Sequence, residues 1–174
     1  GFFELGLASI LPLYGLAMGL GAAAGALLIS VSGLGSTLVA IPVGMVADRF
    51  EDKARGRRTL MVVCAALALA TACALLLVVH AHWLAWPTVF LLGAAGSCLY
   101  TLSMTDIGAR EQGIALVNST AVLVLNYTLG GLVASAVSGA LIDWSPTRGF
   151  PLVLIGVAAV GLAALLRTRR SSTF

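Results

Sequence analysis

Long segments without a single Asp, Glu, Lys or Arg are the feature that most constrains how this chain can fold. Residues 5–47, 59–105 and 112–142 form three such segments, of 43, 47 and 31 residues. An α-helix needs roughly 20 apolar residues to cross a bilayer. A helix on the surface of a soluble protein needs a polar face toward water, which these segments cannot supply. The pattern therefore predicts an all-α membrane protein and excludes a soluble fold.

The apolar segments divide into six predicted transmembrane helices. The first two segments can each hold two crossings, the third holds one long crossing, and the apolar run before the C-terminal arginines supplies the last. The expected helices cover residues 2–18, 23–47, 59–79, 87–105, 112–142 and 151–166. We expect them to form one transmembrane bundle over residues 1–167, followed by a basic cytoplasmic tail over residues 168–174.

The ten Lys and Arg residues are distributed asymmetrically between the two ends of these helices. Five lie between the second and third helices, one between the fourth and fifth, and three after the sixth. On the opposite side only Arg148 is found. Because basic residues remain on the cytoplasmic side of a membrane, this distribution predicts that both ends of the chain are cytoplasmic. We expect the chain in a bacterial inner (plasma) membrane.

Polar residues are concentrated in four of the six helices. The third and sixth helices are almost uniformly apolar, so they should face lipid, whereas the other four should face protein or a water-filled cavity. This division suggests two three-helix repeats. A shift of 95 residues aligns the second helix with the fifth, pairs Gly35 with Gly130, and pairs Asp48 with Asp143 at the helix ends. Since those two aspartates are expected on opposite sides, the repeats would be inverted.

A charged motif links the second and third predicted helices. Its residues are Gly44, Asp48, Arg49, Gly56, Arg57 and Arg58, which we call the latch motif. It resembles the G-x-x-x-D-R-x-G-R-R signature of the major facilitator superfamily, with five additional residues inserted before Gly56. In that family the motif joins the second and third helices of each six-helix half. The resemblance implies the C-terminal half of a twelve-helix transporter, whose partner is the N-terminal half.

The residue types of the latch motif suggest how it would act. Gly44 would allow two helices to approach closely, and Asp48 could accept hydrogen bonds from the N-terminus of a neighbouring helix. Arginines bind carboxylates and lipid phosphates. Together these contacts would hold one conformational state. The alternative is a solvated loop that only sets topology, which is the interpretation we prefer for Lys53 and Arg55.

Several polar residues could line a central cavity. Small and polar residues recur on one face of the fourth helix and on one face of the fifth. By the family resemblance, the first and fourth helices line the cavity. The candidates are Glu4, Tyr14, Ser97, Tyr100, Thr101 and Asn126. Glu4 suggests an ion or proton site if it lies within the membrane, and the cytoplasmic interface is the alternative. Such small residues also allow helices simply to pack.

The predicted function is secondary transport of a small solute by alternating access, with or without protons, in contact with membrane lipids. We expect no enzyme, because an intramembrane protease needs a histidine within the bilayer and both histidines fall in the outer loop. Two histidines without a third ligand are a weak metal signal. No cofactor, metal or nucleic acid is therefore expected. A channel or a non-transporting membrane subunit is the alternative.

Overall fold

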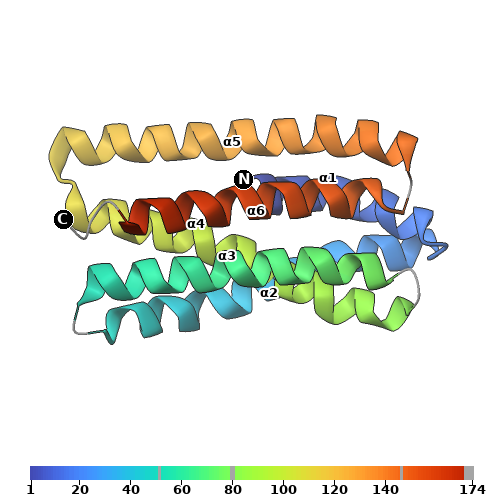
Figure 1. Cartoon of the computed structure of the whole chain (residues 1–174), viewed down its shortest axis with the longest axis horizontal. Coiled ribbons are helices and arrows are strands. Elements are labelled where there is room, and N and C mark those ends of the chain that lie inside the picture. Colours follow the sequence, from blue (N-terminus) through green and yellow to red (C-terminus); the bar gives the residue numbers. More distant parts are fainter. Residues whose placement is uncertain (51, 79–80, 146, 171–174) are drawn as a thin grey trace.

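A computed structural model describes residues 1–50, 52–78, 81–145 and 147–170, without the side chains of residues 48, 141–144 and 168–170. Every regular element in this part of the chain is helical. The elements are α1 (Phe2–Ala17), α2 (Ala22–Asp48), α3 (Lys53–Val78), η1 (His82–Leu84), α4 (Ala85–Arg110), α5 (Gly113–Trp144) and α6 (Gly149–Arg170). The long helices run along a common axis (Figure 1). The predicted all-α fold of six helices is confirmed.

The first helix is shorter than the others. Five helices are long and apolar enough to cross a membrane, whereas α1 is an apolar helix of 16 residues. At 1.5 Å per residue, α1 extends roughly 24 Å and the longest helix, α5, roughly twice that. The N-terminal end of α1 lies about halfway along the bundle (Figure 1). The first turn of α1, which contains Glu4, is therefore far from both ends of the bundle.

The third helix begins six residues earlier than the sequence predicted, at Lys53 instead of residue 59. A local cap explains this start: the backbone N–H of Arg55 donates to Asp52 Oδ1 at 3.0 Å. The N–H of Gly56 donates to the Asp52 carbonyl at 2.9 Å. Aspartate is a favoured residue at this position because its oxygen satisfies an otherwise unpaired N–H of the first turn. Gly56 and Arg57 consequently belong to a helix and not to a loop.

The ends of α4 and α6 also extend beyond the apolar segments. Helix α4 continues to Arg110, so that only Glu111 and Gln112 connect it to α5. Helix α6 continues through residues 168–170, which the sequence assigned to a tail. Charged residues ended the predicted helices, but a helix can continue into water once its backbone hydrogen bonds are established.

The main core lies between the N-terminal half of the chain and α4 and α6. It includes Leu11, Leu75, Leu92 and Leu154, all inaccessible from outside the bundle. Tyr14 belongs to this core. Its hydroxyl donates to the Leu75 carbonyl at 3.0 Å, and its ring packs on Phe150 of α6. The hydrogen bond removes the cost of burying the phenol hydroxyl.

The packing of the helices relates the two halves of the chain. Helix α2 packs mainly on α4, and α5 packs mainly on α1. A Cβ at Gly35 would collide with the Phe90 carbonyl of α4, and one at Gly130 would lie 3.3 Å from the Phe2 nitrogen of α1. The two glycines paired by the 95-residue shift therefore occupy corresponding contacts. This is the arrangement expected of two three-helix repeats in which the second helix of each packs on the first helix of the other.

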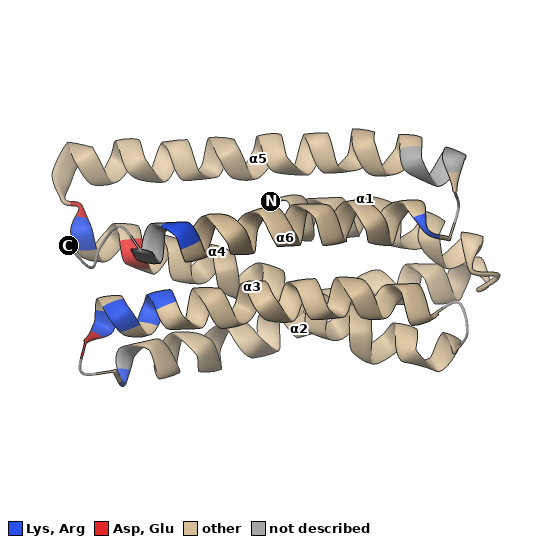
Figure 2. Ribbon diagram, in the orientation of Figure 1, with Lys and Arg blue, Asp and Glu red and all other residues tan. Residues whose placement is uncertain are grey.

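Basic residues gather at one end of the bundle, which we call the basic end. There α2 ends, α3 begins and α4 ends, and Figure 2 shows blue segments at each of these points. The α5–α6 connection, which contains Arg148, lies at the opposite end. Of the five long helices, α2 and α5 bury the smallest share of their residues within the chain. These two helices therefore present the most surface to their surroundings.

Candidate functional site

A cavity of about 250 Å³ lies where the beginning of α1 meets α4 and α5. Because α1 begins about halfway along the bundle, this cavity is remote from both ends (Figure 1). Its wall consists of Gly1, Phe3, Glu4, Gly96, Leu99, Tyr100, Ser103, Leu123, Asn126 and Tyr127. Three predicted cavity residues, Glu4, Tyr100 and Asn126, thus come together from three different helices.

Helical periodicity and one glycine place these side chains on a common surface. On α4, Gly96, Tyr100 and Ser103 are separated by four and three residues and share one face. A Cβ added to Gly96 would lie 3.1 Å from the Cβ of Phe3. Gly96 therefore lets the first turn of α1 approach α4 closely, and this approach brings Glu4 into the same wall as Tyr100.

Glu4 is the acidic group of this cavity and lies beside two tyrosines. Tyr127 of α5 lies in the same wall, and its hydroxyl interacts with the Glu4 carboxyl group. The rings of Tyr100 and Tyr127 have centroids 4.9 Å apart and are tilted by 56°. The α-amino group of Gly1 also interacts with Glu4. Glu4 is thus a half-buried residue of the cavity wall, surrounded by groups from three helices.

Two other polar side chains of the wall each donate one hydrogen bond within their own helix. The Ser103 hydroxyl donates to the Leu99 carbonyl at 2.7 Å, and Asn126 Nδ2 donates to the Val122 carbonyl at 2.9 Å. Each of these side chains keeps an oxygen that can accept a further hydrogen bond. The wall thus combines one carboxylate, two hydrogen-bond acceptors and two aromatic rings.

Three other predicted cavity residues do not line this cavity. Tyr14 is a core residue, as described above, and does not belong to the wall of this cavity. Ser97 and Thr101 are half-buried on α4 but are absent from the wall. Gly93, one turn before Ser97 on α4, packs against α2. There Ser36 Oγ donates to the Gly93 carbonyl at 3.1 Å, and a Cβ at Gly93 would collide with the Ser32 carbonyl.

Two polar wall residues were missed by the sequence analysis. Tyr127 directly follows Asn126, and Ser103 lies three residues after Tyr100 on the same helical face. The spacing from Tyr100 could have identified Ser103. Tyr127 could be assigned only once the crossing of α5 with α1 was known, because that crossing selects which face of α5 is covered.

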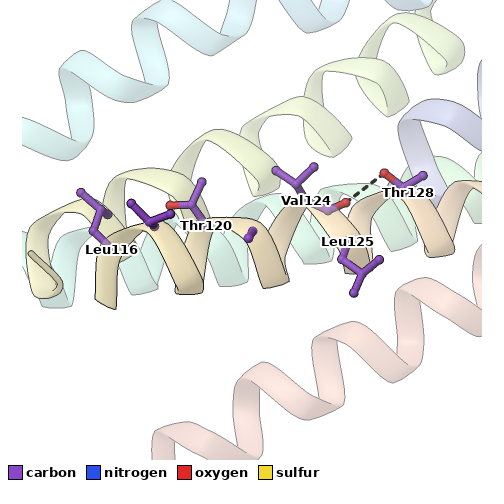
Figure 3. A pocket seen from close by; sticks show the side chains of 7 residues that line it. Leu116, Thr120, Val124, Leu125 and Thr128 are labelled. Atoms are coloured by element: carbon purple, nitrogen blue, oxygen red, sulfur yellow. Dashed lines mark hydrogen bonds between the residues drawn. The ribbon is translucent and has the colours of Figure 1, made fainter. Parts of the chain in front are cut away.

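A second, larger hollow follows one face of α5 (Figure 3). Its lining residues are Leu116, Val117, Thr120, Ala121, Val124, Leu125 and Thr128, all from α5. The Thr128 hydroxyl donates to the Val124 carbonyl at 3.0 Å, so it is satisfied within its own helix. This groove is therefore an apolar surface that is suited to contact with another helix or with lipid, and it offers little to orient a polar ligand.

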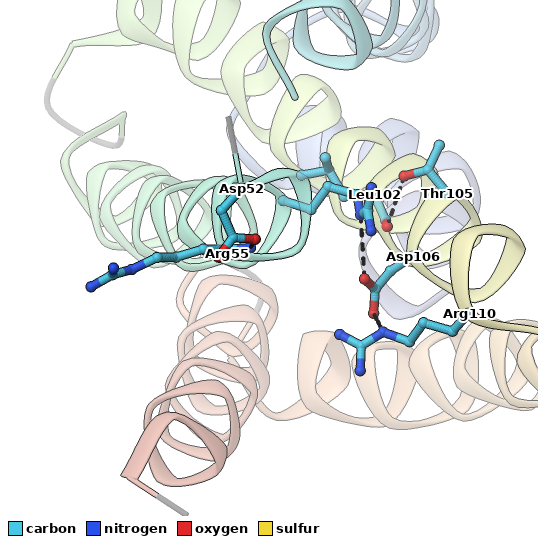
Figure 4. A network of polar contacts seen from close by, with 7 residues as sticks. Asp52, Arg55, Leu102, Thr105, Asp106 and Arg110 are labelled. Carbon is cyan, nitrogen blue, oxygen red and sulfur yellow. Dashed lines mark hydrogen bonds and ion pairs between the residues drawn. The ribbon is translucent and has the colours of Figure 1, made fainter. Parts of the chain in front are cut away.

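At the basic end, one carboxylate connects two helices (Figure 4). Asp106 of α4 accepts from Arg57 of α3, with Oδ1 3.3 Å from Nε, and pairs with Arg110, with Oδ2 2.9 Å from its Nε. The Arg57 side chain is only 9% exposed, whereas that of Arg110 is 62% exposed. Because α4 packs on α3, Asp106 provides a specific carboxylate partner for Arg57 of the latch motif.

The remaining latch residues have different surroundings. A Cβ at Gly56 would collide with the Phe50 ring, so this glycine lets Phe50 pack on the first turns of α3. A Cβ at Gly44 would meet open space, so the predicted close helix approach at Gly44 is not found within this bundle. Arg49 is exposed and Arg58 is half-buried. The side chain of Asp48, the predicted helix cap, lies outside the described residues.

No group of three or more His, Cys, Asp or Glu side chains that could hold a metal ion occurs in the described part of the chain. Cys64 and Cys98 lie together in a small buried cluster with Ala47 and Leu102, where they pack α3 against α4. These thiols fill the helix interface as small apolar side chains do.

Comparison with known proteins adds an independent line of information. Residues 1–173 match the family model described as Major Facilitator Superfamily. An uncharacterized MFS-type transporter, YcaD of Escherichia fergusonii, is 26% identical over 133 residues, which cover 76% of this chain and 32% of that protein. An uncharacterized MFS-type transporter of Yersinia enterocolitica is 28% identical over 126 residues, 72% of this chain and 31% of that protein.

A similar protein of Yersinia pestis, also named an uncharacterized MFS-type transporter, is 29% identical over 126 residues, again 72% of this chain and 31% of the relative. The chain thus spans about a third of the length of these relatives. No solved structure matches the chain.

Proposed function

Because this chain belongs to the major facilitator superfamily, we propose that it is the C-terminal six-helix half of a secondary transporter that moves a small solute by alternating access. The observation that carries this proposal is the cavity deep in the bundle, where α1, α4 and α5 bring together Glu4, Tyr100 and Asn126. A carboxylate at such depth is costly unless it serves a ligand or an ion. A membrane subunit with a purely structural role would gain nothing from it.

The exposed helices support a second six-helix bundle as the partner. Helices α2 and α5 are the least buried of the long helices, and they leave polar side chains exposed: Ser30 and Thr37 on α2, and Asn118 and Asn126 on α5. Polar groups facing hydrocarbon cost on the order of a few kcal/mol each when unsatisfied. An N-terminal half covering α2 and α5 would remove this cost, cover the apolar groove and close the cavity. The segments that match this chain cover only about a third of each relative, which leaves room in those proteins for such a half.

The basic end favours one orientation and gives the latch motif a role. We assign the basic end to the cytoplasmic face of a bacterial inner membrane, where exposed arginines such as Arg49 would bind lipid phosphates. The ion pairs of Asp106 with Arg57 and Arg110 would keep α3 and α4 together while the two halves of the transporter rock against each other. Asp48 would cap a helix in one of the two states.

Reconstitution tests the half-transporter proposal. The chain would be purified and inserted into liposomes alone, and in parallel together with a separately expressed N-terminal half. Counterflow of a radiolabelled panel of sugars, amino acids, amines and organic anions would be measured in both preparations. We expect saturable, selective uptake only when both halves are present, because one bundle has nothing to rock against. Selective uptake by the monomeric chain alone would overturn the proposal.

A further inference from the structure

We propose that the cavity formed by α1, α4 and α5 binds a small organic monocation, with its ammonium group against Glu4 and its apolar part against Tyr100 and Tyr127. The inference rests on the proposed function, because it names the substrate class of the same cavity. It concerns the chemistry of the wall, which can be tested by binding alone.

The charge of the wall selects the sign of the ligand. Glu4 is the one side chain among the ten wall residues that is charged at neutral pH. The Lys and Arg residues whose side chains the structure describes lie toward the two ends of the bundle, and none of them belongs to the wall. The Glu4 side chain is half-buried, and a ligand ammonium would form a charge-assisted hydrogen bond with its carboxylate. A carboxylate or phosphate ligand would instead be repelled.

The chain already has one ammonium group beside this carboxylate. The α-amino group of Gly1 belongs to the wall and interacts with Glu4. In a transporter in which an upstream half is joined to Gly1, this nitrogen is part of a peptide bond and carries no charge. The negative charge of Glu4 is then left for the ligand.

The hydrogen-bond acceptors of the wall favour a ligand that donates. Ser103 uses its one donor within α4 at 2.7 Å and Asn126 uses one of its two donors within α5 at 2.9 Å, and both side chains retain oxygens that accept. Together with Glu4 they form an acceptor-rich wall. An ammonium with two or three N–H groups can satisfy several of these oxygens at once, whereas a ligand that only accepts cannot.

The aromatic rings provide a place for the rest of the ligand. Tyr100 and Tyr127 have ring centroids 4.9 Å apart with a tilt of 56°, and apolar wall residues such as Phe3 and Leu123 continue this surface. Aromatic faces attract cations and also pack against apolar groups. The cavity volume of about 250 Å³ lies just below the range of roughly 300–1,000 Å³ that is typical of drug-sized ligands. The site therefore fits a small aryl or alkyl amine.

Three probes with the same carbon skeleton would test this inference. Phenethylammonium, 2-phenylethanol and phenylacetate have similar size but positive, zero and negative charge. Binding of each would be measured by calorimetry on the purified, detergent-solubilised transporter with both halves present. We expect phenethylammonium to bind at least about tenfold more tightly than 2-phenylethanol, and phenylacetate to bind the weakest. Tighter binding of phenylacetate, or no binding of phenethylammonium at millimolar concentration, would overturn the inference.

Two carboxylate variants locate the charge that is responsible. Glu4→Gln should weaken the binding of phenethylammonium at least about tenfold and leave the binding of 2-phenylethanol unchanged. Glu4→Asp, which keeps the carboxylate, should retain part of the affinity for phenethylammonium. Glu111→Gln removes the same charge from the α4–α5 connection, outside the cavity, and should change no affinity. Unchanged 2-phenylethanol binding shows that the Glu4→Gln cavity is folded. Equal affinity of wild type and Glu4→Gln for the cation would overturn the inference.

Transport measurements separate this inference from the proposed function. If phenethylammonium binds through Glu4 but no counterflow occurs in proteoliposomes, the binding site stands and the transporter proposal fails. If the reconstituted protein transports an anion or a neutral solute from the panel and ignores amines, the transporter proposal stands and the cation inference fails.

Discussion

Arg57 near the start of α3 and Asp106 near the end of α4 form an ion pair, with 3.3 Å between Nε and Oδ1, although 49 residues separate them in the sequence. The Arg57 side chain is almost fully shielded from solvent, so the Asp106 carboxylate compensates the positive charge of its guanidinium. Arg110, four residues after Asp106, binds the second oxygen at 2.9 Å but is largely exposed. The same carboxylate thus has one shielded and one solvated partner.

This difference leads to a prediction about stability. Asp106→Asn should destabilise the bundle on the order of 2 kcal/mol, because it leaves the Arg57 guanidinium shielded without a counter-charge. Arg110→Gln should cost less than about 1 kcal/mol, since exposed pairs contribute little. Thermal unfolding in detergent would measure both. Equal losses of melting temperature in the two variants would show that Asp106 acts only as a surface charge.

A second prediction concerns Asp48 of the latch motif. If this carboxylate caps a neighbouring helix in one conformational state, Asp48→Asn in the complete transporter should retain expression but reduce transport severely. Lys53→Gln, on an exposed residue of the same segment, should have little effect. Counterflow rates normalised to protein amount would compare the two. Similar losses from both changes would mean that the segment acts through its total charge.

A third prediction concerns proton coupling by Glu4. Three groups lie around the Glu4 carboxylate: the hydroxyl of Tyr127, the ring of Tyr100 that packs on Tyr127, and the amino group of Gly1. If Glu4 exchanges a proton for the substrate, Glu4→Gln should abolish the response of uptake to an imposed pH gradient. Exchange at saturating substrate should persist, because it requires no net proton movement. A pH response equal to that of the wild type would limit Glu4 to ligand binding.

A fourth prediction compares two glycines of α2. Gly35→Ala should impair folding, because the new methyl group would collide with the Phe90 carbonyl at the α2–α4 crossing. Gly44→Ala should leave the stability of the chain unchanged, since the added methyl group meets open space. Yield of monodisperse protein in detergent would measure both effects. A stable Gly35→Ala variant would contradict the observed crossing.

Gly44 also allows a test of the partner surface. If its open face contacts the N-terminal half, Gly44→Leu should preserve the fold of this chain and reduce transport by the complete protein. Loss of folding in the isolated chain would instead indicate a contact within the bundle.

The number of the helices and their approximate positions were determined by the sequence alone. Segments without charge must lie in lipid or in protein, whatever the neighbouring helices do, because the cost of exposing or burying a side chain depends first on its own chemistry. The clustering of arginines at one end follows from the same composition. The early start of α3 could also have been predicted, because the cap formed by Asp52 with Arg55 is local.

The contacts between helices were decided by the tertiary structure. Periodicity placed Tyr100, Ser97 and Thr101 near one another on α4, but the α2–α4 crossing at Gly93 decided which part of that surface stays open. Glu4 meets Tyr127 only because α1 packs on α5, 123 residues later in the chain. Asp106 likewise acquires Arg57 only through the packing of α3 on α4. A residue's partners depend on how whole helices are rotated and crossed, and that rotation reflects the sum of many small packing contacts between segments that are distant in the sequence.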